Sequence, residues 1–325
     1  MNTERLLRIL ADGRFHSGPA IGAALGVSRS AIWKQLHALE GLGVEVFAVS
    51  GRGYRLAAPL DLLEEGAIRA AMDSAGTNLL GGLELLTRID STNRHLRQRM
   101  LDGVPRGYAV LAEQQTAGRG RRGRPWVSPF AAHVYLSVGW RFAASPSTLA
   151  GLPLAVGVAA VQVLRGLGIG APTLKWPNDV WHDGRKLGGI LLELAGEAGG
   201  PCDVVAGLGM NVAMPIHAAG QVDQPWTDLQ TIMGARRPSR SALAGTLIAQ
   251  VLQALARYEG EGLEPFLADW RRHDAVAGQR VRVSAGGQEI AGIAEGVDDS
   301  GALLLECAGS TVRFASGEVS LRAAP

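Results

Sequence analysis

The first sixty residues contain short helical segments, a glycine turn and a basic hairpin in sequence. Apolar residues recur at helical spacing until Asp12-Gly13 interrupts them. Ser17 and Ser28 each precede a segment with apolar residues on one face, and Gly26 separates the two segments. Serine is a favoured helix N-cap, and glycine often ends a helix. Two short helices joined by a glycine-containing turn are typical of a helix-turn-helix.

The second of these helices carries the polar and aromatic side chains expected of a DNA reader. Its outward positions, together with the tip of the following hairpin, give the candidate DNA-binding residues Arg29, Ser30, Trp33, Lys34 and Arg52. Residues 1–60 hold seven Lys/Arg and four Asp/Glu, so their net charge is 7 − 4 = +3. The order of helix, turn, helix and basic hairpin favours a winged-helix domain. The alternative is a helical packing domain with a solvated basic face.

Whole-chain composition limits the classes of function. The net charge of +2 comes from 32 basic and 30 acidic residues, so any nucleic-acid binding must be local. Cys202 and Cys307 lie far apart without metal-ligand spacing, which fits a reducing cytoplasm. The N-terminus lacks the features of a signal peptide. Residues 149–164 are apolar but too short to span a membrane, and they predict a buried helix.

Residues 118–124 read GRGRRGR, between an apolar strand pattern at 108–112 and Pro125-Trp126. Glycines let a backbone wrap closely around a ligand, and guanidinium groups suit phosphate or carboxylate oxygens. The string also matches G-x-G-x-x-G, but no helix or acidic residue follows where a dinucleotide site needs them. The segment predicts an anion-binding loop, with a solvated basic loop as the alternative.

Three further segments place polar residues at strand ends. They read KWPND at 175–179, RKLGGILLE at 185–193, and GLGMN at 207–211. Lys186 stands at the start of an apolar strand, where its charge can face a bound carboxylate or phosphate. Taken singly, each segment could equally be a strand end with a polar turn.

Together with Ser91-Thr92-Asn93 and Gln115, these segments resemble the biotin protein ligase family over nearly the whole chain. The order of the motifs resembles its bifunctional branch, which also represses biotin synthesis. The resemblance implies a biotin site, for which the candidates are Ser91, Thr92, Asn93, Gln115, Arg119, Arg121, Lys186, Gly189 and Gly207. It implies catalytic roles for Lys186, Arg119 and Arg121, where Lys186 touches the biotin carboxylate and the α-phosphate of ATP.

The resemblance also implies a nucleotide site. Its candidates are Arg119, Arg121, Trp126, Lys175, Asn178, Asn211, Trp226 and Arg322. Residues 212–226 align with the segment that covers the adenylate in this family. Family members bind Mg²⁺ with ATP, and Asp179 is the candidate to help hold it.

The expected fold is an α+β multidomain chain. We predict a winged helix-turn-helix at residues 1–60, and a central α/β catalytic domain of the class II synthetase-like biotin/lipoate ligase fold at 61–274. From about Gly278, short alternating apolar runs predict a small antiparallel β-barrel. The resemblance implies an SH3-like C-terminal domain there, at 275–325.

The function implied is ATP-dependent formation of biotinyl-5′-AMP and transfer of biotin to a lysine of a biotin carboxyl carrier protein. The adenylate would also act as corepressor for a homodimer on operator DNA. Two alternatives stay open. One is a lipoate protein ligase, and the other is a transcription factor that senses biotin without catalysis.

Overall fold

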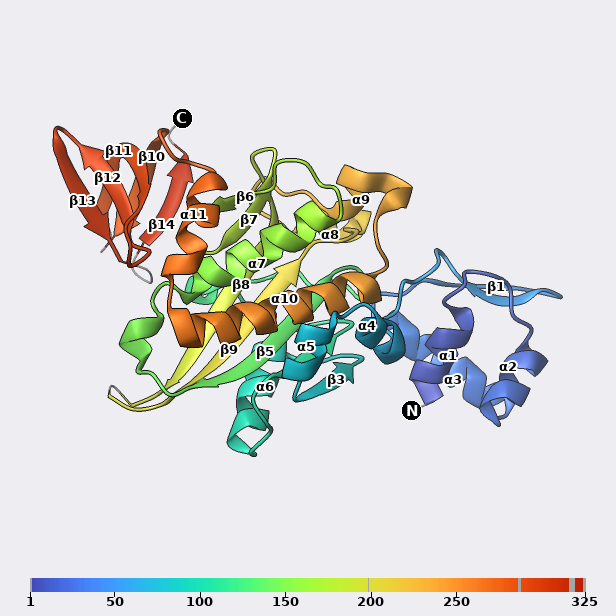
Figure 1. Ribbon diagram of the computed structural model, residues 1–325. Helices are drawn as coiled ribbons and strands as arrows, with labels where there is room; N and C mark the ends of the chain where they lie inside the picture. Colours follow the sequence, from blue (N-terminus) through green and yellow to red (C-terminus); the bar gives the residue numbers. More distant parts are fainter. Residues whose placement is uncertain (1, 198, 286–287, 316–318, 324–325) are drawn as a thin grey trace.

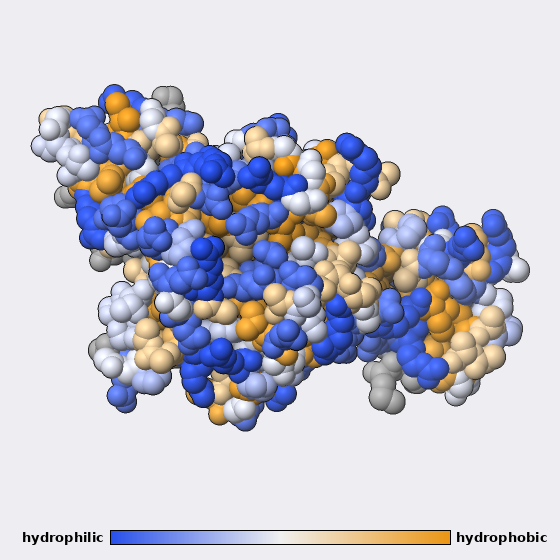
Figure 2. All heavy atoms as spheres, viewed as in Figure 1, coloured by the Kyte–Doolittle hydropathy of each residue, from blue (hydrophilic) through white to orange (hydrophobic). Residues whose placement is uncertain are grey.

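The computed structural model describes residues 2–197, 199–285, 288–315 and 319–323. Figure 1 shows three parts in a row, with the N-terminal helices and hairpin at one end and a C-terminal β-sheet at the other. In the space-filling view the N-terminal part is a separate lobe, and the surface on its hairpin side is largely hydrophilic (Figure 2). The expected division into a helix-turn-helix, a mixed α/β unit and an antiparallel β unit is confirmed.

The N-terminal lobe has the predicted helix-turn-helix and hairpin. It contains α1 (Asn2–Leu10), α2 (Gly18–Leu25) and α3 (Arg29–Glu40), followed by β1 (Val46–Val49) and β2 (Gly53–Leu56). Ser17 and Ser28 cap α2 and α3, since each hydroxyl accepts a backbone N–H from the first turn. Gly26 takes the left-handed conformation that ends α2. We call residues 46–56 the wing.

The central unit is built on a seven-stranded mixed sheet. Its strand order is β3-β4-β5-β9-β8-β7-β6, and the β3–β4 pair is parallel while the other pairs are antiparallel. The strands are β3 (Gly82–Leu86), β4 (Tyr108–Ala112), β5 (Val134–Phe142), β6 (Thr173–Lys175), β7 (Asp179–His182), β8 (Arg185–Gly196) and β9 (Cys202–Met210). The turn between β7 and β8 brings the KWPND and RKLGG segments together.

Two long helices lie side by side across one face of this sheet (Figure 1), and their apolar residues form the main core with it. They are α7 (Leu152–Gly166) and α10 (Arg240–Glu261). The segment Pro146–Gly166 is long and apolar enough to pass as a membrane span, but 72% of its most apolar window is buried inside the protein. It is therefore a core helix, as predicted. On the opposite face, α6 (Thr92–Leu101) packs against β4 and β9 through Leu96 and Met100.

Shorter elements complete the central unit. They are α4 (Glu65–Ala70), α5 (Ser74–Leu79), α8 (Ile216–Ala219), α9 (Leu229–Met233) and α11 (Glu264–Arg272), with 3-10 turns at Arg121–Gly123, Pro146–Leu149 and Gly234–Arg236.

The C-terminal part is a five-stranded antiparallel sheet in the order β13-β12-β11-β10-β14. Its strands are β10 (Arg280–Ala285), β11 (Gln288–Val297), β12 (Leu303–Cys307), β13 (Ser310–Phe314) and β14 (Val319–Ala323). The indole N–H of the buried Trp176 donates to the backbone carbonyl of Gly301 at 3.0 Å. This bond ties the C-terminal sheet to the KWPND segment, so the sheet is held close to that strand end.

The N-terminal lobe contacts the central unit directly. Phe130 and Ala131 of the central unit belong to the same apolar cluster as the core of the lobe. Leu60 N–H donates to Ala11 O, and Leu63 N–H donates to the carboxylate of Glu113. The segment that joins the two parts is thus bonded to the lobe at Leu60 and to the central unit at Leu63. The expected domain boundary after residue 60 stays a prediction.

Candidate active site

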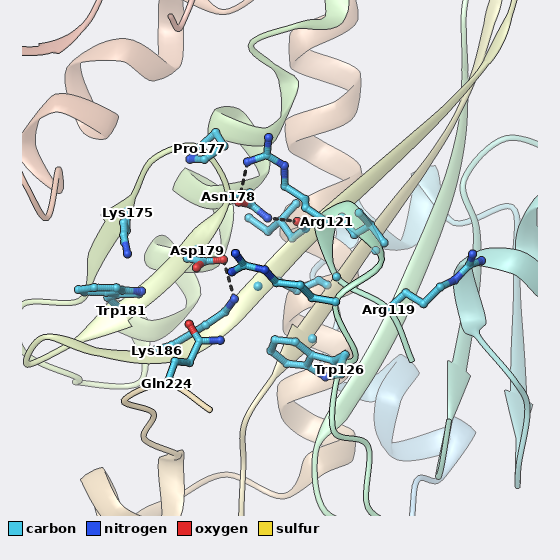
Figure 3. A pocket seen from close by; sticks show the side chains of 18 of the residues that line it. Arg119, Arg121, Trp126, Lys175, Pro177, Asn178, Asp179, Trp181, Lys186 and Gln224 are labelled. Atoms are coloured by element: carbon cyan, nitrogen blue, oxygen red, sulfur yellow. Dashed lines mark hydrogen bonds and ion pairs between the residues drawn. The ribbon is translucent and has the colours of Figure 1, made fainter. Parts of the chain in front are cut away.

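A cavity of about 970 Å³ opens at the strand ends of the central sheet. It is lined by residues 119–122 and 124–126, the start of α6, the ends of β6 to β9 and residues 223–225. The segments singled out in the sequence therefore converge, although they lie up to about a hundred residues apart. Figure 3 shows Lys186 and Asp179 meeting inside this cavity, with Asn178 and Arg121 beside them and Trp126 nearby.

The arginine loop (residues 118–124) is folded back on itself. Trp126 N–H donates to Gly118 O, and Gly120 N–H donates to Arg124 O. Arg122 and Gly123 both have positive φ, at 56° and 73°, which makes the tight reversal. The loop consequently places several guanidinium groups at the cavity rim.

Arg121 is the arginine of this loop that most clearly indicates an anionic ligand. One of its terminal nitrogens donates to Asn178 Oδ1 at 3.4 Å, while Nη2 is buried without a hydrogen-bond partner in the described part of the chain. Burial lowers the pKa of Arg121, and the neighbouring Arg122 lowers it further. A buried guanidinium nitrogen without a partner is costly, and an anionic ligand would satisfy it.

Lys186 forms the second positive element of the site. Its Nζ lies 2.8 Å from Asp179 Oδ1, and both side chains are largely buried. The same Nζ lies 5.4 Å from the ring centroid of Trp126. Strand register brings Lys186 and Asp179 together. β7 and β8 pair antiparallel with Trp181 opposite Lys186, and Asp179 lies two residues before Trp181 in β7. A substrate anion entering here would share the ammonium group with Asp179.

The glycines of the RKLGG and GLGMN segments leave room for cavity side chains. A Cβ on Gly209 would lie 2.5 Å from Trp126 Cε2, and one on Gly189 would lie 3.1 Å from Trp126 Cζ3. A Cβ on Gly207 would lie 2.3 Å from Asn93 Oδ1. These glycines let Trp126 and Asn93 press directly onto the sheet.

A hydrogen-bonded polar group forms another wall of the cavity. Gln115 Oε1 accepts from both the N–H and the hydroxyl of Thr92, at 2.9 and 3.1 Å. Asn93 Nδ2 donates to Leu191 O at 3.1 Å. Ser91 is the N-cap of α6 and is buried beside them. Their side chains offer fixed donors and acceptors next to the apolar strands, as recognition of a polar ring requires.

Two residues of this wall were missed by sequence reasoning. Ser137 Oγ donates to Asn93 Oδ1 at 2.6 Å and lies 2.8 Å from Thr92 Oγ1, while Ser128 Oγ accepts from Gln115 Nε2 at 3.3 Å. Ser137 is a polar position within the otherwise apolar segment VYLSVG, which is a signal that could have found it. Trp181 also lines the cavity and was not predicted, while Gln224 lines it from within the predicted covering segment at residues 212–226.

Two of the predicted nucleotide contacts, Asn211 and Trp226, are not among the described residues that line the cavity. Asn211 is buried, and its Nδ2 donates to the carbonyls of Lys186 and Thr227 instead of facing the cavity. Trp226 forms a backbone bridge with Lys186 and is not among the cavity-lining residues described, although residues 223–225 are. Arg322 has its backbone in β14 opposite Arg282, but its side chain lies outside the described residues.

Arg119 lines the rim of the cavity without entering its centre. It is exposed, and Figure 3 shows its side chain extending away from Arg121 and Lys186. Lys175, in contrast, lines the cavity with its Nζ 4.3 Å from the ring centroid of Trp181.

The candidate metal residue Asp179 is not part of a ligand cluster. Among the residues that the structure describes, no group of three or more His, Cys, Asp or Glu side chains could hold a metal. Mg²⁺ is often bound by one or two carboxylates together with substrate phosphates. Asp179 in this cavity fits such a role.

The candidate DNA-binding residues are all exposed on the N-terminal lobe. Arg29, Ser30, Trp33 and Lys34 are all exposed on α3, and Arg52 is exposed at the turn of the wing. The guanidinium of Arg52 lies 4.4 Å from the ring centroid of Phe15, which positions it over the lobe.

This fold and cavity define a ligase of the biotin and lipoate type joined to a DNA-binding module. Residues 85–211 match the biotin/lipoate A/B protein ligase family, residues 276–322 match the biotin protein ligase C-terminal domain, and residues 2–55 match an HTH domain. The chain is 43% identical to the bifunctional ligase/repressor BirA of Salmonella typhimurium, over 98% of this chain and 97% of that protein. It is 36% identical to the biotin--[acetyl-CoA-carboxylase] ligase of Mycobacterium tuberculosis, over 82% and 97%.

A solved structure supports the same assignment. The biotin protein ligase from Aquifex aeolicus in complex with biotin and ATP superposes with a TM-score of 0.64 at 27% identity, covering 75% of this chain and 99% of that one. The chain therefore belongs to the biotin protein ligase family, in its branch of bifunctional ligase/repressors.

Proposed function

We propose that this chain activates biotin with ATP and transfers it to a lysine of a biotin carboxyl carrier protein, in a cytoplasmic compartment. The observation that carries the proposal is the convergence of Arg121 and Lys186 on one cavity beside the polar wall of Thr92 and Gln115. Two positive groups next to a fixed polar wall suit a carboxylate that meets a phosphate.

The first step forms a mixed anhydride. A carboxylate oxygen of biotin attacks the α-phosphorus of ATP, pyrophosphate leaves, and biotinyl-5′-AMP stays bound. Negative charge increases on the oxygens around the phosphorus, so the fixed charges of Lys186 and Arg121 stabilise the transition state. Trp126, pressed onto Gly209, gives the adenine a flat surface to stack on.

The second step transfers the biotinyl group. The ε-amine of the acceptor lysine attacks the anhydride carbonyl, AMP leaves, and an amide bond forms. The chemistry needs no enzyme nucleophile, but the anhydride must be kept from water. We infer that the arginine loop, with Arg119 at its rim, and the covering segment (residues 212–226) close over the cavity for this purpose. Asn211 and Trp226 would contribute to the nucleotide site only after such closure, and Arg322 remains a further candidate for it.

Magnesium would neutralise phosphate charge when it binds with ATP, held by Asp179 and phosphate oxygens.

Incubation with ATP and a carrier domain tests the ligase proposal. With biotin we expect pyrophosphate release and a biotin-sized mass gain on the carrier domain. Lipoate should give neither, which separates this chain from a lipoate ligase. Tight binding of biotin without pyrophosphate release would instead support a sensor without catalysis.

We further propose that the N-terminal lobe binds operator DNA as a homodimer when the adenylate is bound. The exposed α3 and the wing supply phosphate and base contacts, and two lobes related by symmetry fit a two-fold operator. A gel shift on DNA upstream of biotin-synthesis genes, with and without biotin and ATP, tests this. Equal binding in the two conditions would contradict a corepressor role.

A further inference from the structure

Trp33 is the feature of the N-terminal lobe that a generic DNA-binding role leaves unexplained. Its side chain is 56% exposed, although indole is among the most apolar surfaces a protein can show to water. It lies on α3, the second helix of the helix-turn-helix, on the exposed side of the helix next to the buried Ile32 and Leu36. Among the residues that the structure describes, the apolar core cluster of the lobe does not include Trp33.

The indole is held in place by a second ring. The ring centroids of Trp33 and His37 lie 3.9 Å apart at an interplanar angle of 40°, and His37 Nδ1 lies 2.9 Å from Trp33 O. A side chain fixed before binding loses less conformational entropy when it makes a contact. The Trp33 side chain is therefore preorganised for binding.

The surroundings of Trp33 suit a nucleic-acid groove. Arg29, Trp33 and His37 recur every four residues and so form one ridge along the helix. Lys34 is exposed next to this ridge, and the wing adds Arg52. Arg29 and Lys34 would neutralise phosphates next to the indole, which favours a DNA duplex over a second copy of this equally basic lobe.

An indole can recognise one feature of the major groove through apolar contact. Base edges there present donors, acceptors and a single apolar group, the C5-methyl of thymine. Indole has one donor and no acceptor, so most of its surface matches the methyl group better than any polar edge. We propose that Trp33 is a specificity-determining residue that contacts a thymine methyl in the major groove of each operator half-site. This inference rests on the proposed DNA-binding function.

Selection and base analogues test the inference on the full-length protein. Duplexes are first enriched from a random pool in the presence of biotin and ATP, and each thymine of the enriched site is then replaced by uracil, which lacks the methyl. In each half-site we expect one thymine whose replacement alone weakens binding about fourfold, which is the effect of removing one buried methyl group. Trp33→Ala should bind the thymine and uracil duplexes equally, and Trp33→Phe should keep part of the preference.

Arg52→Ala is the matched control. Loss of the Arg52 side chain should weaken binding to the thymine and uracil duplexes by the same factor, because a phosphate contact carries no sequence information. The fold of each variant is checked by its melting curve.

The possible failures are distinguishable. If no duplex is enriched, the DNA-binding proposal itself fails and the inference with it. If a duplex is enriched but every uracil replacement is silent, or Trp33→Ala keeps the preference, DNA binding stands and the role of Trp33 is wrong. Uniform weakening by Trp33→Ala with the preference intact would make Trp33 a phosphate contact.

Discussion

Glu113 and Arg240 form an ion pair inside the protein, with 2.5 Å between Glu113 Oε2 and Arg240 Nη1, although Arg240 is only 1% exposed. Arg240 also donates to the backbone carbonyls of Asp61 and His133, while Glu113 accepts from Leu63 N–H. The pair thus connects the chain that follows the N-terminal lobe to β4 and to the start of α10. Gln115, in the cavity wall, is two residues from Glu113.

The first prediction concerns this pair. Arg240→Met should destabilise the central unit by about 3–5 kcal/mol, because it leaves the Glu113 carboxylate buried without its partner. Urea unfolding followed by tryptophan fluorescence measures the change. Arg237→Met is the matched control, since the Arg237–Asp61 pair is more exposed and should cost about 1 kcal/mol or less. Equal losses in the two variants would contradict the assignment.

The Glu113–Arg240 pair illustrates what the sequence could not provide. Caps at Ser17 and Ser28, the buried helix and the strand at 108–112 depend on local patterns, and the structure confirms them. Glu113 and Arg240 are 127 residues apart, and no local pattern tells a buried arginine from a solvated one. The same applies to Ser137, whose partners Thr92 and Asn93 come from a distant helix.

For the cavity, the motifs indicated which segments meet but not how the side chains point. Lys186 and Arg121 both line the cavity, and their catalytic roles stay predictions. Asn211 does not face the cavity, because its amide is bonded to backbone carbonyls, and Arg119 extends away from its centre. Side-chain direction depends on strand register and loop closure, which periodicity does not determine. The nucleotide roles of Asn211, Trp226 and Arg322 stay predictions.

Lys186→Ala should slow formation of the adenylate by about 30- to 1,000-fold, which corresponds to the loss of about 2–4 kcal/mol of transition-state stabilisation. Biotin-dependent pyrophosphate release measures the rate. Arg185→Ala is the control, because Arg185 is exposed and precedes Lys186 in the same strand. A rate within threefold of the parent protein would exclude Lys186 from the proposed chemistry.

Arg121→Gly should weaken retention of the adenylate. Its buried guanidinium would donate a charge-assisted bond to the ligand, so its removal should speed adenylate release by about 10- to 150-fold. Released adenylate reacts with lysines at random, so we expect biotin labelling of bystander proteins. Arg119→Gly, in the same loop but directed away from the cavity centre, should label them much less. The reverse order would assign the retaining role to Arg119.

Gly209→Ala should displace Trp126, because the added Cβ would lie 2.5 Å from Trp126 Cε2. Overpacking of this kind typically costs about 1–3 kcal/mol of folding stability. The displaced indole should also lower kcat/KM for ATP, because it no longer offers its surface to the adenine. Gly220→Ala, where a Cβ meets nothing within 4 Å, should be neutral. An unchanged kcat/KM in Gly209→Ala would mean that Trp126 does not contribute to the nucleotide site.

His133 should make stability depend on pH. Burial, and secondly the charge of Arg240, lower its pKa to about 4, and its neutral Nδ1 accepts the N–H of Val212 at the base of the covering segment. Between the unfolded pKa of about 6.5 and the folded value, the unfolded chain binds the proton and the folded chain does not, so stability falls as the pH falls. The loss from pH 7 to pH 5 should be roughly 2 kcal/mol. His133→Asn, whose side-chain oxygen can still accept from Val212, should lose this contribution in urea unfolding at the two pH values. If the variant and the parent protein lose the same stability, His133 does not cause the dependence, and other groups that titrate in this range must do so.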